Sequence, residues 1–160
     1  MPLKQGSEPL PYRIRAAHQK LVAAASELNA ASDRFALLVA EIDATLKSLN
    51  LGIAAWVRLG PGWSDDRGKE GYEEVGYDKI NGKWCIGVRA HEWHFSEPED
   101  ENPSCWTFGD GPRRLRLKAV EYLPNLLEKL AGDATGETKD VASKAEDLEK
   151  MVSVLKEGLQ

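Results

Sequence analysis

The segment YEEVGYDKI-NG-KWCIGVRAHEWHF, residues 72–95, decides the fold of this chain. At its centre, Asn81-Gly82 is the strongest short signal for a β-hairpin, because both residues tolerate the positive φ of a two-residue turn. Such a turn fixes the register, so that the numbers of paired residues add up to 163. This register is chemically consistent, and the segment therefore predicts antiparallel strands over 72–80 and 83–95. The pairs are Tyr77 with Ile86, Val75 with Val88, Glu74 with Arg89, and Gly76 with Gly87.

Shorter segments extend the hairpin into a predicted sheet of three or four antiparallel strands. Residues 51–59 alternate with period two and place Trp56 on the face opposite Ala55 and Val57. Residues 104–108 form a candidate fourth strand, whereas the polar, glycine-bearing stretch 63–71 predicts an exposed loop. The facing glycines of the hairpin leave bare backbone, across which the ring of Trp56 can lie flat. Such a patch either accommodates a ring as part of the core or forms a docking groove.

Long amphipathic helices are predicted on both sides of the sheet. Over residues 12–50 a first apolar line recurs every seven residues, and a second line through Ala25, Val39 and Leu46 widens the stripe. Residues 112–159 repeat this spacing, with Pro124 predicting a kink or a short first helix and Gly132 marking an alternative break. The first line comprises Ile14, Leu21, Leu28, Phe35, Ile42 and Leu49, and its counterpart comprises Val120, Leu127, Ala134, Val141, Leu148 and Leu155.

The expected fold class is α+β. Two long antiparallel helices, in a helical hairpin or coiled coil, would carry a three- or four-stranded antiparallel β-sheet inserted between them. Residues 1–11, with three prolines, predict a flexible N-terminal tail. Residues 12–160 predict a single domain, divided into a long helix over 12–50, the sheet over 51–111 and a second long helix over 112–159.

Composition and charge narrow the classes of partner. The chain has 160 residues, with 21 Lys and Arg against 26 Asp and Glu, a net charge of −5. This balance argues against a general attraction to nucleic acid or to an anionic membrane surface. Apolar stretches fall far below the ~20 residues that cross a bilayer, and no signal peptide is recognised, so we expect a cytoplasmic protein. Its two cysteines, Cys85 and Cys105, cannot form a disulfide framework and are expected to be free thiols.

Three residues of metal-binding type lie near the end of the hairpin. His91, His94 and Cys105 could ligate zinc together with a carboxylate from residues 97–101. A regular strand places His91 and His94 on opposite faces, so this site requires a bend near Glu92. The alternative is a strand end whose imidazoles face solvent.

Four basic residues gather at the predicted start of the second long helix, where they oppose the helix dipole. Phosphates of a nucleic acid could offset them, or the acidic loop over 97–101 could do so within the chain. The acidic net charge favours the internal pairing. The residues are Arg113, Arg114, Arg116 and Lys118.

No phosphate-binding loop, dinucleotide fingerprint or zinc-protease motif is present, so the sequence predicts neither a cofactor nor a catalytic residue. The leading expectation is a non-enzymatic protein–protein interaction or scaffold protein that forms a homodimer through its helices and can bind a further protein. The alternatives are a metal-binding protein or metal-dependent enzyme, and a nucleic-acid-binding protein. Candidate partner-binding residues are Ala25, Val39 and Leu46 on the helix, and Trp63 and Trp93 in the sheet region.

Overall fold

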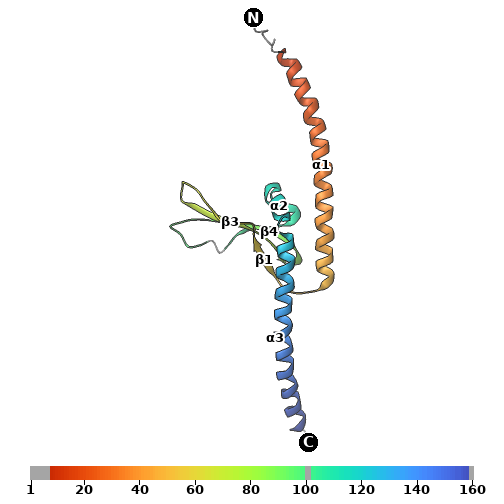
Figure 1. Ribbon diagram of the computed structural model, residues 1–160, viewed down its shortest axis with the longest axis vertical. Coiled ribbons are helices and arrows are strands. Elements are labelled where there is room, and N and C mark those ends of the chain that lie inside the picture. The colour runs from red at the N-terminus through yellow and green to blue at the C-terminus, as the bar shows by residue number, and fades with distance from the viewer. Residues whose placement is uncertain (1–7, 100–101, 159–160) are drawn as a thin grey trace. The chain divides into compact units, whose positions relative to one another are not determined.

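The computed structural model describes residues 8–99 and 102–158 and has the order helix, sheet, helix (Figure 1). The long N-terminal helix α1 spans Leu10–Leu49, and an antiparallel sheet follows it. The chain is therefore an α+β protein with its sheet between helices in sequence. The strands are β1 Ala55–Arg58, β2 Trp63–Ser64, β3 Lys69–Ile80, β4 Lys83–His94 and β5 Ser104–Thr107. A 3-10 turn η1 over Phe108–Asp110, helix α2 over Arg113–Val120 and helix α3 over Leu123–Glu157 complete the chain.

The central hairpin has the register that the sequence predicts. β3 and β4 pair with Val75 opposite Val88, Glu74 opposite Arg89 and Gly76 opposite Gly87. Asn81 and Gly82 both have positive φ, 51° and 78°, as a tight two-residue turn requires. β1 adds to the free edge of β3 and β5 to that of β4, which gives the strand order β1-β3-β4-β5. The strands expected over 51–59 and 104–108 are thus confirmed.

The stretch 63–71 differs from the expected loop. Trp63 and Ser64 form the short strand β2, which pairs with the first residues of β3. Asp65 closes the turn between them, since its Oδ1 accepts hydrogen bonds from the backbone N–H groups of Arg67 and Lys69, each at 2.9 Å. Gly68 supplies a φ of 80° in the same turn. The sequence pattern did not predict this hairpin, because its turn depends on the hydrogen bonds of one aspartate side chain and not on a recognisable two-residue turn sequence.

One face of the sheet packs against α2 and α3 and forms the core. Val75 and Val88 are fully buried on this face, and Leu115 of α2 and Leu126 and Leu130 of α3 are at most 2% exposed. Each such leucine stabilises the fold by about 1.5–3 kcal/mol through removal of its side chain from water. Because side chains alternate along a strand, the residues directly before and after each of these valines point to the opposite face.

The C-terminal helical region divides at Glu121 and Tyr122. α2 ends at Val120, and α3 begins at Leu123 with Pro124 in its first turn, where the missing N–H leaves no helical bond unmade. The alternative break near Gly132 does not occur, because α3 continues through both Gly132 and Gly136.

The chain forms two structural units, Met1–Ile42 and Asp43–Gln160. In the second unit, Asp43 Oδ1 accepts a hydrogen bond from the backbone N–H of Ile86 at 2.7 Å, which anchors the last turns of α1 to β4. The antiparallel pairing of the two long helices stays a prediction. Of the tail expected over 1–11, residues 1–7 lie outside the described part, and Leu10 and Pro11 belong to α1. Among the described residues, no helix combines the length and apolar composition needed to span a lipid bilayer.

Candidate functional site

The sheet face opposite the core carries a connected row of aromatic and charged side chains. These residues alternate with the buried valines along the strands, so the hairpin register places them on one face. We call this set the polar sheet face. It comprises Trp56 and Arg58 of β1, Tyr72, Glu74 and Asp78 of β3, and Arg89, His91 and Trp93 of β4.

At one end of the polar sheet face, the indole of Trp56 lies across the backbone of Gly76. A Cβ placed on Gly76 would come within 2.3 Å of the ring, so only glycine leaves room for it. This confirms the prediction that the ring lies across the bare backbone of the paired glycines. Trp56 Nε1 donates a hydrogen bond to Asp78 Oδ2 at 2.9 Å, and the guanidinium of Arg89 lies 4.0 Å above the indole. The ring is thus held on its edge and on its face.

Glu74 joins the two ends of the polar sheet face. Its Oε2 accepts a hydrogen bond from Arg89 Nε at 2.5 Å and one from His91 Nε2 at 2.9 Å. The carboxylate is buried, and the imidazole of His91 is only 7% exposed. A buried carboxylate needs such charged or polar partners, because water no longer solvates it. Glu74 therefore fixes the positions of both β4 side chains.

Tyr72 lies beyond His91 and has contacts on both faces of its ring. The imidazole of His91 stacks at 4.3 Å between centroids, and the guanidinium of Arg58 lies 3.8 Å from the Tyr72 centroid. Trp93 meets Tyr72 edge to face at 5.9 Å. Burial, followed by the negative charge of Glu74, raises the pKa of the Tyr72 hydroxyl above its ordinary value. This hydroxyl therefore stays protonated at neutral pH.

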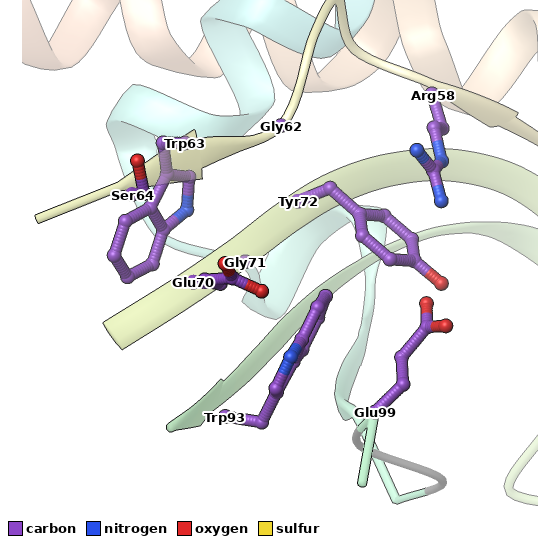
Figure 2. Close-up of a pocket in the computed structure, with 9 residues that line it drawn as sticks. All are labelled: Arg58, Gly62, Trp63, Ser64, Glu70, Gly71, Tyr72, Trp93 and Glu99. Carbon is purple, nitrogen blue, oxygen red and sulfur yellow. The ribbon is translucent and has the colours of Figure 1, made fainter. Parts of the chain in front are cut away.

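A shallow hollow of about 400 Å³ opens where the polar sheet face meets β2. Figure 2 shows the indoles of Trp63 and Trp93 on two sides of Glu70, with the carboxylate of Glu99 beside the Tyr72 hydroxyl. The charged groups that line the hollow are the guanidinium of Arg58 and the carboxylates of Glu70 and Glu99. The lining residues are Arg58, Gly62, Trp63, Ser64, Glu70, Gly71, Tyr72, Trp93 and Glu99. Their hydroxyl and carboxylate groups belong to Ser64, Tyr72, Glu70 and Glu99.

The structure does not bring together the metal ligands suggested by the sequence. β4 stays regular through His94, so His91 and His94 lie on opposite faces of the strand. His91 binds Glu74, whereas His94 Nδ1 lies 2.6 Å from the hydroxyl of Ser96. The alternative of solvent-facing imidazoles is wrong for His91, which is buried. Within residues 8–99 and 102–158, no three His, Cys, Asp or Glu side chains are grouped to hold a metal ion.

Two of the basic residues at the start of α2 are paired within the chain, with a partner that the sequence did not indicate. The carboxylate of Glu73 on β3 binds the guanidinium of Arg114 and lies 3.4 Å from Lys118 Nζ. Burial alone would raise the pKa of Glu73, but the two positive charges outweigh it and hold this pKa below its ordinary value. The described partner of these two residues is thus Glu73, whereas residues 100 and 101 of the loop expected to pair with them lie outside the described part of the chain. Arg113 is exposed, and Arg116 is half-buried with its Nε unbonded.

The remaining candidate residues separate into two groups. Trp63 and Trp93 come together at the hollow, as side chains that are 41% exposed and half-buried, respectively. On α1, Ala25 is exposed, but Val39 and Leu46 are buried at 6% and 4% and are not open to a partner. Sequence reasoning missed Tyr72 and the hydrogen bond between Glu74 and His91, although the hairpin register already placed all three residues on one face.

Both cysteines are free thiols. Burial raises the pKa of each thiol above its ordinary value, so neither Cys85 nor Cys105 has the acidic character of a reactive cysteine.

Comparison of the chain with known protein families, with curated protein sequences and with solved structures found no match.

Proposed function

We propose that this chain is a non-enzymatic scaffold or interaction protein that associates with a second copy of itself through α1. The observation that carries the proposal is the exposure of large apolar side chains at heptad spacing: Ile14, Leu21 and Leu28 are 60%, 66% and 48% exposed. The residues at this heptad spacing, together with the apolar residues three positions after them, form what we call the α1 seam. Its members are Ile14, Ala17, Leu21, Ala24, Leu28, Ala31, Phe35, Leu38 and Ile42.

Helix stability supports the same proposal. α1 has 40 residues, and most of them fall in a structural unit that contains no other described helix or strand. Helical structure in proteins depends mainly on the packing of an apolar face, because backbone propensity alone leaves isolated helices marginal in water. A regular apolar line on such a helix is typical of coiled-coil association. Pairing of the α1 seam with another helix would supply the missing packing.

The two alternative functions have less support from the site. A metal-dependent activity needs His91, which binds Glu74 instead. Nucleic-acid binding through α2 needs free positive charges, but Glu73 already neutralises part of that cluster. On the polar sheet face, Arg89 and His91 are both bound to Glu74, and Trp56 is bound to Asp78. Association through a helix remains the function best supported by the described residues.

Sedimentation velocity at several concentrations tests the proposal. The full chain is expected to sediment as a dimer or larger species, with the monomer appearing on dilution. Leu28→Asp should shift the protein to monomer, because it places a charge inside the α1 seam.

Val22→Asp is the matched control, because Val22 is also exposed, at 56%, but lies outside the α1 seam. It should sediment like the wild type. A wild-type chain that stays monomeric at about 100 μM, a concentration well above typical specific affinities, overturns the proposal. So does a Leu28→Asp variant that associates as well as the control.

A further inference from the structure

The charged residues beside the α1 seam form a pattern that the proposed self-association leaves unexplained. The positions just before Leu21, Leu28, Phe35 and Ile42 are occupied by Lys20, Glu27, Arg34 and Glu41, in alternating sign. In the part of the chain that the structure describes, no ion pair involves Lys20, Glu27 or Arg34. Charges that flank a coiled-coil seam select the partner and its direction. The pattern therefore carries information about how a second copy is oriented.

We infer that α1 pairs antiparallel with α1 of a second copy, with Glu27 opposite Arg34 and Lys20 opposite Glu41 of that copy. This inference rests on the proposed self-association. Reversing one of two identical helices brings the same flank of each helix to the same side. A charged residue on this flank of one copy then lies opposite a residue on the same flank of the second copy, and the numbers of the two residues add up to 61. With the symmetry equivalents, the dimer has four pairs of opposite charge and no clash in this part of the flank.

Eight of the nine members of the α1 seam form layers with one another in this register, and Ile14 lies opposite Thr45. The helices interdigitate in layers whose residue numbers add up to 59, two below the flanking pairs. Each flanking residue therefore lies slightly to the C-terminal side of the point opposite its partner. Because side chains on a helix lean toward its N-terminus, the charged side chains of the two antiparallel helices lean toward each other and can meet. The layers are Leu21 with Leu38, Leu28 with Ala31, Phe35 with Ala24, and Ile42 with Ala17. Three of these four layers join a large and a small side chain, so the helices can approach closely along about 39 Å.

The other flank of the seam raises no objection. Near the two-fold axis the register places Ala25 opposite Ser32 of the second copy. Both side chains are small and uncharged, so no like charges meet there. A parallel dimer would instead place Glu27 near Ser32 and Arg34 near Val39, and would use none of the four ion pairs. Charge complementarity therefore favours the antiparallel arrangement.

Charge reversal on the full chain tests the register. Glu27→Lys and Arg34→Glu each turn two attractive pairs of the dimer into repulsive ones, and each is expected to weaken self-association about tenfold. The double variant with both substitutions restores opposite charges and should regain the wild-type affinity. An equimolar mixture of the two single variants should form mainly heterodimers, which native mass spectrometry separates by mass. The differences should shrink at 1 M salt, which screens exposed charges.

Asp33→Lys is the matched control, because it makes the same kind of charge change on the outer side of α1. A wild-type dimer that loses no more affinity in Glu27→Lys than in Asp33→Lys overturns the register but leaves self-association intact. The same holds if the single variants mix without preference for heterodimers. A wild-type chain that never dimerises overturns both the register and the proposed function.

Discussion

Substitution of Gly76 by alanine probes the contact that organises the polar sheet face. An alanine Cβ at this position would lie 2.3 Å from Trp56 Cδ2 and 2.7 Å from the carbonyl oxygen of Ala55. Both distances are well inside van der Waals contact. The carbonyl belongs to β1, which is paired with β3, and the indole is held by Asp78 and Arg89. Neither neighbour can therefore move away without loss of another interaction.

The expected loss of stability follows from these contacts. Overpacking of a closely packed site costs about 1–3 kcal/mol. Displacement of the ring also weakens its contact with Arg89, worth about 0.5–1 kcal/mol, and its hydrogen bond to Asp78, worth about 1 kcal/mol. We expect Gly76→Ala to lower the free energy of unfolding by about 3 kcal/mol. For a chain of this length that corresponds to a melting temperature roughly 10 °C lower.

Thermal and urea unfolding followed by circular dichroism measures this effect. Gly132→Ala is the matched control: a Cβ on Gly132 would meet nothing within 4 Å, and alanine is the better helix former. It should raise the free energy of unfolding by about 1 kcal/mol. The same Gly76→Ala change made together with Trp56→Ala should cost less, because the ring is gone. A cost that is equal in both backgrounds, or below about 0.5 kcal/mol in the wild type, refutes the account, since surface substitutions already vary by that much.

Other contacts lead to further expectations. Because the folded-state pKa of Glu73 is lowered, its ion pairs stabilise the protein above the unfolded-state pKa of about 4.3, and this stabilisation is lost as the pH falls through the folded-state value. Urea titrations should therefore show Glu73→Gln to be less stable by about 1 kcal/mol at pH 7, with a gap that closes as the pH falls below the folded-state pKa; a constant gap contradicts the assignment. Glu74→Ala leaves Arg89 without its carboxylate and should lower the free energy of unfolding by about 2–3 kcal/mol, and by less in Glu74→Gln, which keeps an acceptor. Leu130→Ala should cost about 2–5 kcal/mol in the core, whereas Leu148→Ala, at a side chain 58% exposed, should leave the unfolding of the monomer nearly unchanged.

The hairpin was predictable because its information is local. A two-residue turn leaves only one register, and Asn81-Gly82 defines that turn within a dozen residues on either side. The same register implied the polar sheet face, since it fixes which side chains alternate with Val75 and Val88. The position of the Trp56 ring across Gly76 was predictable because glycine has no side chain there. These features needed no knowledge of how distant segments pack.

The partners of His91 and Arg114 were not recognised from residue type alone, and that of Arg114 lies far away in the chain. Glu73 and Arg114 are 41 residues apart and meet only because α2 packs on the core face of the sheet. His91 was expected near a strand end, but β3 begins at Lys69 and pairs with β4 through His94, so that His91 lies within the sheet and is bound by a buried carboxylate. Residue type suggested a metal ligand or a phosphate contact in these cases. Tertiary packing instead supplied an intramolecular partner of opposite charge.

The two apolar lines of α1 indicate that the widened stripe serves two different purposes. Val39 and Leu46 of the second line are buried, whereas Leu21 and Leu28 of the first line remain largely exposed. A stripe formed only to complete the core of one chain would be buried along both lines. The first line also continues toward the N-terminus, through Ile14, well beyond the buried residues of α1. Under the proposed self-association, an identical helix running in the opposite direction would cover the exposed line with the complementary order of charges.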